Sequence, residues 1–218
     1  MYVKDVKDIT YKLLKEKLQP LGYKGNKKDQ KFIKKNDLGF DEVRFGTAEY
    51  AGIKLYNLYF YVAVRVDKVQ ELENLAHDFS TEDAHLKTVT SNVNCGTFIG
   101  QHKFEFDIRS PEDVENAVGT FWEIYNEHAI EHMKKCYDIN YLNSLWPTYG
   151  LLKTNGIDIR NWLTIYGWYH KVLTIAYLAN PQTFPQFREE FINYLVNECN
   201  VSDDVRQKLD EYLDKITT

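Results

Sequence analysis

The chain has 218 residues, a formal net charge of −5 and an aromatic content of 15%. Its length and apolar content are enough to bury a core, which argues against disorder, and its acidic balance argues against nucleic-acid binding by the chain as a whole. Three cysteines, Cys95, Cys136 and Cys199, lack the paired spacings of zinc sites and redox motifs.

The N-terminal stretch "MYVKDVKDITYKLLKEKL" is charged throughout, and nowhere do 18 apolar residues follow one another. We therefore expect a soluble cytoplasmic protein that does not insert into a membrane and keeps its thiols reduced.

An amphipathic helix is predicted over residues 3–19, where apolar residues recur at helical spacing until Pro20 and Gly22 interrupt them. Strands follow near 30–35, 40–48 and 53–66, separated by the turn sequences "NDLG" and "YAG". Such short connections predict antiparallel pairing.

A helix beginning at Asp67 is predicted next, and after it two strands, 85–91 and 97–108. The second of these, "TFIGQHKFEFDI", alternates between large apolar and polar residues, as a half-buried strand does.

Ser110, Pro111 and Asp113 are typical of a helix start, with an N-cap, a proline in the first turn and a capping acid. The helix should run to about Cys136 and place one apolar side on the sheet. That side contains Val114, Val118, Phe121, Tyr125, Ala129, His132 and Cys136.

Beyond Tyr137 the periodicity is helical, over about 139–146, 158–179, 186–199 and 203–216. The sequence therefore predicts an α+β fold, with a mostly antiparallel sheet of about five strands covered by helices and an all-helical C-terminal portion. The predicted domains are a sheet domain over 1–137 and a helical subdomain over 138–218, packed on it.

Residues 55–66, "LYNLYFYVAVRV", divide into two faces if they form a strand. The even-numbered face, Tyr56, Leu58, Phe60, Val62, Val64 and Val66, is interpreted as core. The odd-numbered face carries Tyr59 and Tyr61, which we expect to pack against the helical C-terminal portion. A surface that binds protein, or on which RNA bases stack, is the alternative for this face.

The segment Lys24–Lys35 contains six lysines and one aspartate, a formal +5 that leaves −10 on the rest of the chain. It could bind phosphate groups or an acidic partner, or it could be a solvated hairpin whose lysines protect a sheet edge from aggregation. The candidate residues are Lys24, Lys27, Lys28, Lys31, Lys34 and Lys35.

"HAIEH" matches the pattern of inverted zinc peptidases, with His128 and His132 as metal ligands and Glu131 as general base. The glutamate that such peptidases place about 70 to 76 residues downstream as third ligand is missing, so a zinc hydrolase is a remote alternative. No nucleotide-binding or hydrolase motif occurs, and no cofactor is predicted.

Three stretches together carry a resemblance: a first helix ending in "LQPLGYKG", the strand "YNLYFYVAVRV" running into "DKVQELENL", and the helix end "HMKKCYDINYL". They resemble an uncharacterised group of bacterial α+β domains over residues 1 to about 145. Some proteins of similar build are immunity proteins that neutralise secreted toxins. The resemblance implies a toxin-binding role, and it identifies no catalytic residue.

The first functional hypothesis is a protein-interaction module, an immunity-like inhibitor of a toxin or of another protein partner, and a non-enzymatic role is favoured. Acidic residues of the 110–136 helix could capture a basic toxin. The candidate partner-binding residues are Glu112, Glu115, Glu123, Glu127, Tyr59 and Tyr61. The alternative is nucleic-acid or phosphate binding through the Lys24–Lys35 hairpin and the Tyr59/Tyr61 face.

Overall fold

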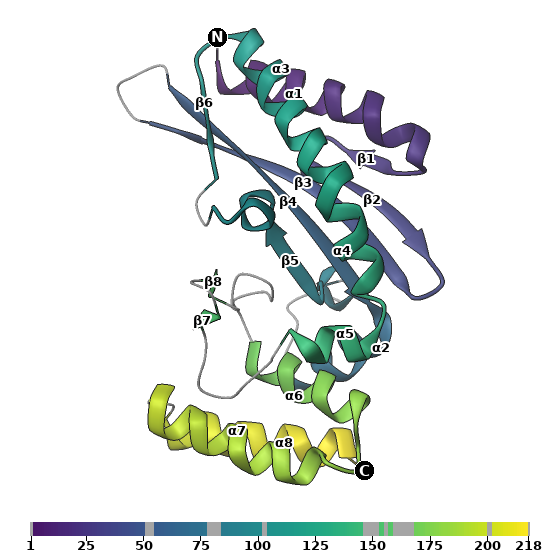
Figure 1. Cartoon of the computed structure of the whole chain (residues 1–218), viewed down its shortest axis with the longest axis vertical. Helices are drawn as coiled ribbons and strands as arrows, with labels where there is room; N and C mark the ends of the chain where they lie inside the picture. Colours follow the sequence, from purple (N-terminus) through teal and green to yellow (C-terminus); the bar gives the residue numbers. More distant parts are fainter. Residues whose placement is uncertain are drawn as a thin grey trace. The chain divides into compact units, whose positions relative to one another are not determined.

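The fold is α+β, as predicted (Figure 1). The computed structural model describes residues 2–50, 55–77, 84–101, 104–145, 153–154, 157–158, 168–199 and 202–217. No helix among these residues is long and apolar enough to cross a membrane.

The chain forms two compact units. Unit 1 comprises Met1–Val64 and Asn92–Lys134, and unit 2 comprises Arg65–Ser91 and Lys135–Thr218. The predicted boundary after residue 137 lies near the second junction, but residues 65–91 join the C-terminal segment instead of the sheet domain. They do so because α2 (Asp67–Glu73) packs on α6 (Trp168–Ala179), a contact between distant parts of the sequence.

The sheet has the strand order β1-β2-β3-β4-β5, and β6 also pairs with β4. The strands are β1 (Lys24–Asn26), β2 (Lys31–Asn36), β3 (Gly39–Glu49), β4 (Tyr56–Val66), β5 (Ser91–Asn94) and β6 (Phe106–Ile108). The pairs β1–β2, β2–β3 and β4–β6 are antiparallel. The "NDLG" turn is a tight hairpin, in which Asn36 pairs with Gly39 and its side chain accepts a hydrogen bond from the Leu38 amide at 2.8 Å.

Two long helices, α1 (Val3–Leu18) and α3 (Pro111–Ile124), lie side by side on one face of the sheet (Figure 1). The Tyr11 ring of α1 stacks on Phe32 of β2 with centroids 5.0 Å apart, and Phe121 of α3 stacks on Phe60 of β4 at 4.5 Å. The core of unit 1 therefore lies between these helices and this face.

The helix predicted over 110–136 is confirmed with its cap. Ser110 and Asp113 form a reciprocal capping box, and hydrogen bonds from the Arg109 and Ser110 amides lower the pKa of the Asp113 carboxyl. A π-helical turn, η5 (Tyr125–Ala129), separates α3 from α4 (Ile130–Lys135). All seven residues of the predicted apolar side are buried.

The strand predicted over 97–108 is wrong for most of its length, since η4 (Cys95–Ile99) is a 3-10 helix and β6 begins only at Phe106. Asn94 starts η4 by accepting a hydrogen bond from the Gly96 amide, and Gly100 ends it in the left-handed conformation with φ +75°. These local caps prevail over the alternating pattern. The strand predicted over 85–91 is also wrong, because η3 (Ala84–Lys87) is a 3-10 helix and β5 begins at Ser91.

Unit 2 is mostly helical. Besides α2 and α6 it contains η2 (Asn74–Ala76), η3, α5 (Ile139–Ser144), α7 (Phe184–Cys199) and α8 (Asp203–Thr217). A small hairpin, β7 (Lys153–Thr154) with β8 (Ile157–Asp158), corrects the all-helical prediction. The part of the predicted 158–179 helix that precedes α6 lies almost entirely outside the described residues. From His170 to Ala176 every residue of α6 is buried, as its apolar sequence predicts.

Replacing Phe60 with alanine should lower the free energy of unfolding by about 3–5 kcal/mol, because the stacked Phe60–Phe121 pair would become a cavity. Chemical denaturation followed by circular dichroism measures this change. Leu38→Ala, at a 56% exposed hairpin position, is the control and should stay within about 0.5 kcal/mol of the wild type. An equal effect of the two variants would contradict the assigned core.

Candidate functional site: the face of the sheet opposite the helices

Strand β4 divides its side chains as the alternation predicted. All six even-numbered residues are buried, at 5% exposure or less, so the prediction that they form the core is confirmed. The odd-numbered side chains project from the face opposite α1 and α3, and among them Tyr59 and Tyr61 are half-buried.

Tyr59 and Tyr61 contact each other edge to face, with ring centroids 5.7 Å apart and planes at 82°. The Tyr59 ring lies directly over Gly46 of β3, where an added Cβ would come within 2.3 Å of the ring. Glycine at this position therefore leaves room for the hydroxyl end of the ring against the neighbouring strand. Burial, with Tyr61 and Glu105 nearby, raises the pKa of the Tyr59 hydroxyl.

Arg44 lies beside Tyr61, with its guanidinium carbon 5.3 Å from the ring centroid. It also lies 3.8 Å from Glu42 Oε1, while Lys31 Nζ is 3.4 Å from Glu42 Oε2. The Glu42 side chain is 3% exposed, so a buried carboxylate holds two cations against the sheet.

The structure separates the six lysines of the basic hairpin. The register places Lys24 beside Ile33, which in turn pairs with Glu42. It places Lys31 beside Arg44 and Lys35 beside Phe40, so these three lysines share the face of Arg44. Three others lie elsewhere: Lys27 pairs with Asp8 at 3.0 Å, Lys28 is exposed in the turn, and Lys34 lies over the Tyr23 ring on the helix-covered side.

We call the set Lys24, Lys31, Lys35, Arg44, Tyr59 and Tyr61 the basic–aromatic face. Its acids include Glu42, within it, and Glu105 and Asp107, at one end. Asn57 pairs in register with Asp107 and donates hydrogen bonds to Glu105 and to the Tyr50 hydroxyl. The four cations outnumber these three carboxylates, which makes this face basic in an acidic chain. The sequence contained both halves of the face, but Arg44 was missed because nothing in its local pattern sets it apart.

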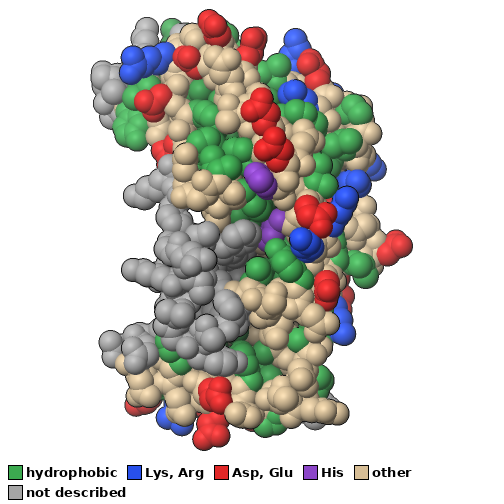
Figure 2. All heavy atoms as spheres, viewed as in Figure 1, with side chains coloured by type: hydrophobic (Ala, Val, Ile, Leu, Met, Phe, Trp, Pro, Cys, Tyr) green, Lys and Arg blue, Asp and Glu red, His purple; other side chains and the backbone are tan. Residues whose placement is uncertain are grey.

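The acidic candidates lie on another surface. Glu112, Glu115, Glu123 and Glu127 are all exposed, and Figure 2 shows acidic side chains gathered over α3. Glu127 lies 3.8 Å from His128. Because α3 covers the opposite side of the sheet, these glutamates and the tyrosines Tyr59 and Tyr61 do not form one site.

The two histidines of the zinc pattern differ in environment. The His128 side chain is 44% exposed beside Glu127, whereas His132 is buried with its ring 5.4 Å from that of Phe98. Among the described residues no three His, Cys, Asp or Glu side chains gather as metal ligands would. The geometry therefore adds nothing to the zinc alternative.

Two of the pockets that the described residues form lie near charged side chains. One, of about 390 Å³, is lined by Tyr11, Lys15, Gln19, Gly22, Tyr23, Lys24 and Gly25 in unit 1. Lys15 lies in the last turn of α1, where a cation complements the helix dipole without any ligand.

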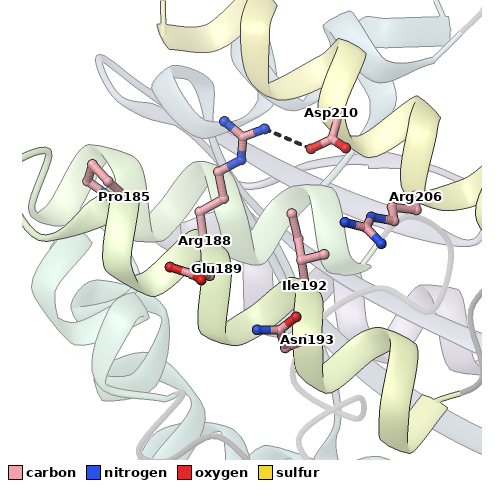
Figure 3. Close-up of a pocket in the computed structure, with 7 residues that line it drawn as sticks. All are labelled: Pro185, Arg188, Glu189, Ile192, Asn193, Arg206 and Asp210. Carbon is pink, nitrogen blue, oxygen red and sulfur yellow. Dashed lines mark hydrogen bonds and ion pairs between the residues drawn. The ribbon is translucent and has the colours of Figure 1, made fainter.

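The second pocket, of about 270 Å³, lies between α7 and α8 in unit 2 (Figure 3). It is lined by Pro185, Arg188, Glu189, Ile192, Asn193, Arg206 and Asp210. Arg188 forms an ion pair with Asp210 at 2.7 Å. With Glu189 and Arg206 the lining carries two cations and two anions, so its formal charge is zero and it favours neither anionic nor cationic ligands.

Unit 2 contains a buried ionisable cluster that sequence reasoning missed. Lys171 of α6 donates a hydrogen bond to the Val89 carbonyl at 2.7 Å and lies 3.5 Å from Glu73 of α2. Glu73 also accepts a hydrogen bond from Gln70 at 2.5 Å. Burial lowers the pKa of Lys171, while Glu73 favours its charged form. Nothing in the sequence pairs two residues this far apart.

His170 lies next to this cluster. Its ring centroid lies 5.5 Å from that of His77 and 4.9 Å from that of Tyr212, and its buried Nδ1 has no hydrogen-bond partner among the described residues. Burial, and then the nearby His77, lowers the pKa of His170 to about 4. Since these groups are buried and tie α2 to α6 and α8, we interpret the cluster as part of the framework of unit 2.

Comparisons with known proteins do not narrow the choice. No protein-family model, curated protein or solved structure matches this chain. What the chain binds must therefore be inferred from its own residues.

Replacing Glu73 with glutamine should lower the free energy of unfolding by about 3–5 kcal/mol, because Lys171 would keep its buried charge without a counter-charge. The double variant Glu73→Gln/Lys171→Met should recover much of that loss. Urea denaturation of the four members of this double-mutant cycle measures the coupling. Additive effects would mean that the two side chains do not interact.

Acid should destabilise unit 2 through His170. Its folded pKa of about 4 lies below the ordinary value of 6.5, so the unfolded chain binds the proton first. The stability is complete above pH 6.5 and falls by about 3 kcal/mol as the pH drops to about 4. Urea denaturation from pH 7.5 to 4 should show a smaller fall in His170→Gln than in the wild type, and parallel curves would contradict the assignment.

Proposed function

We propose that this protein is a protein-interaction module and that the basic–aromatic face is its binding surface. The observation that carries the proposal is that Tyr61 contacts both Tyr59 and Arg44 on the sheet face opposite α1 and α3. Tyrosine and arginine are the residues in which protein interfaces and their hot spots are enriched.

The arrangement resembles an interface centre with a charged rim. Half-buried tyrosines lose little conformational entropy when a partner covers them, and their hydroxyls remain available for hydrogen bonds. Lys24 and Lys35 are exposed on the flanking strands. Basic rim residues steer an acidic protein toward the face and raise its association rate.

A second candidate surface is the exposed acidic side of α3. The apolar side of α3 is buried on the sheet, which leaves Glu112, Glu115, Glu123 and Glu127 exposed together. An immunity-like inhibitor could use such a surface to capture a basic toxin. Localisation in the cytoplasm belongs to the proposal. The buried cysteines Cys95 and Cys136, which form no disulfide among the described residues, support it.

The test compares partner capture by three forms of the full chain from a lysate of its own host. The first is the wild type, the second carries Tyr61→Ala with Lys35→Glu, and the third carries Glu112→Lys with Glu123→Lys. We expect one stoichiometric protein to be retained by the wild type and the α3 variant and lost by the face variant. A Tyr→Ala change at an interface centre costs about 2 kcal/mol or more, roughly thirtyfold in affinity.

Each other result contradicts the proposal. Loss of the partner in the α3 variant alone would move binding to the acidic side of α3. Nucleic acid in the eluate, released by salt and absent with the face variant, would favour the nucleic-acid alternative. Equal retention of the partner by all three forms would exclude both surfaces as its binding site. Matching circular dichroism spectra and melting curves ensure that the variants are folded.

A further inference from the structure

We infer that the partner is acidic and that it presents a carboxylate group to Arg44, which is the specificity-determining residue of the basic–aromatic face. This inference rests on the proposed function and specifies the chemistry of the partner. The carboxylate is the side chain of an Asp or Glu residue on the surface of the partner protein.

Arg44 is held in place, but among the described residues its N–H groups donate no hydrogen bond. Its side chain is 37% exposed, and Glu42 at 3.8 Å is an ion-pair contact too long for a hydrogen bond. Among the described residues no oxygen accepts a hydrogen bond from the guanidinium at 3.5 Å or less. The N–H groups of Arg44 are therefore available to a partner.

Two neighbours fix the orientation of Arg44. The Tyr61 ring lies under the guanidinium, and Glu42 holds it from the side. Glu42 is itself buried and shared with Lys31, so it cannot turn outward to neutralise the exposed side of Arg44 without losing Lys31. A guanidinium that is oriented in advance binds with a smaller loss of side-chain entropy.

The geometry of arginine selects the ligand. Its planar fork of N–H groups matches a carboxylate with two parallel hydrogen bonds, and such charge-assisted pairs are stronger than neutral ones. Lys24 and Lys35 extend the positive charge along the two flanking strands. A segment with several Asp or Glu residues is therefore complementary to the face in both charge and shape.

A phosphate group has similar hydrogen-bonding chemistry, but the aromatic residues favour a protein. Single-stranded nucleic acids bind by stacking bases on exposed ring faces. Here Arg44 covers one face of Tyr61, and Tyr59 meets Tyr61 edge to face while its hydroxyl end lies against Gly46. The ring faces are therefore partly covered, which suits a protein surface better than base stacking.

The test uses two labelled probes of similar charge. A fluorescein-labelled peptide of ten glutamates represents an acidic protein, and a labelled ten-nucleotide oligothymidylate represents nucleic acid. Fluorescence anisotropy measures the dissociation constant of each at three salt concentrations. Arg44→Lys should weaken binding of the acidic peptide by about tenfold without changing its salt dependence, since the charge is kept and the fork is lost.

Lys35→Ala is the matched control on the same face. It removes a charge remote from the Arg44–Glu42 pair, so it should weaken binding by about threefold or less and reduce the salt dependence. Tyr61→Leu should act like Arg44→Lys, because it removes the ring that orients the guanidinium. Unchanged melting temperatures show that these effects do not come from unfolding.

Three results would overturn the inference. They are no binding of the acidic peptide, equal binding by Arg44→Lys and the wild type, and tighter Arg44-dependent binding of the oligonucleotide. Capture from the host lysate distinguishes a failure of the carboxylate inference from a failure of the proposed function. If Arg44→Lys still retains the partner that Tyr61→Ala with Lys35→Glu loses, the interaction face stands and the carboxylate assignment fails. If both variants retain it, both proposals fail.

Discussion

The alternation of side chains across the sheet is the constraint on which unit 1 depends, because α1 and α3 both cover the same face. The side chains that point toward the centre of these helices are largely apolar, and the stacked pairs Tyr11–Phe32 and Phe60–Phe121 are the result. The same alternation directs Lys31, Arg44 and Tyr61 to the opposite face. One arrangement thus produces both the hydrophobic core and the candidate interaction surface.

Buried charge has a different role in each unit. In unit 1, Glu42 is buried but its two cations remain partly exposed, so the ion pairs position groups that can still reach a partner. In unit 2, Lys171 and Glu73 are both buried and satisfied within the fold. Desolvating such a pair costs free energy, and removing one partner costs more, because it leaves a buried charge without a counter-charge. The pair therefore holds α2 against α6 in one arrangement.

The charge of the whole chain gives little guidance to its binding. The net charge is −5, yet the exposed glutamates of α3 and the cations of the basic–aromatic face lie on opposite sides of one sheet. An approaching molecule responds to the local field within about one Debye length, roughly 8 Å in the cell. Such a protein can therefore present an acidic surface to one partner and a basic surface to another.

The sequence by itself determined the features that depend on neighbouring residues: the capped helix at Ser110, the buried side of that helix, the two faces of β4 and the tight hairpin at Asn36. It predicted a strand over 97–108 of which only Phe106–Ile108 is a strand, because the Asn94 cap and Gly100 outweigh an alternating pattern. It indicated the lysines and tyrosines of the candidate surface, but it could not decide which lysines share a face with Tyr61.

Only the tertiary structure decided that division, because strand register converts sequence position into a side of the sheet. It also brought Arg44 to Tyr61, joined residues 65–91 to the C-terminal helices and paired Glu73 with Lys171. Each of these contacts joins residues from different strands or helices, and no local propensity encodes the meeting of two distant segments. The elements were therefore largely determined by the sequence, and the surface that they form together was determined by the fold.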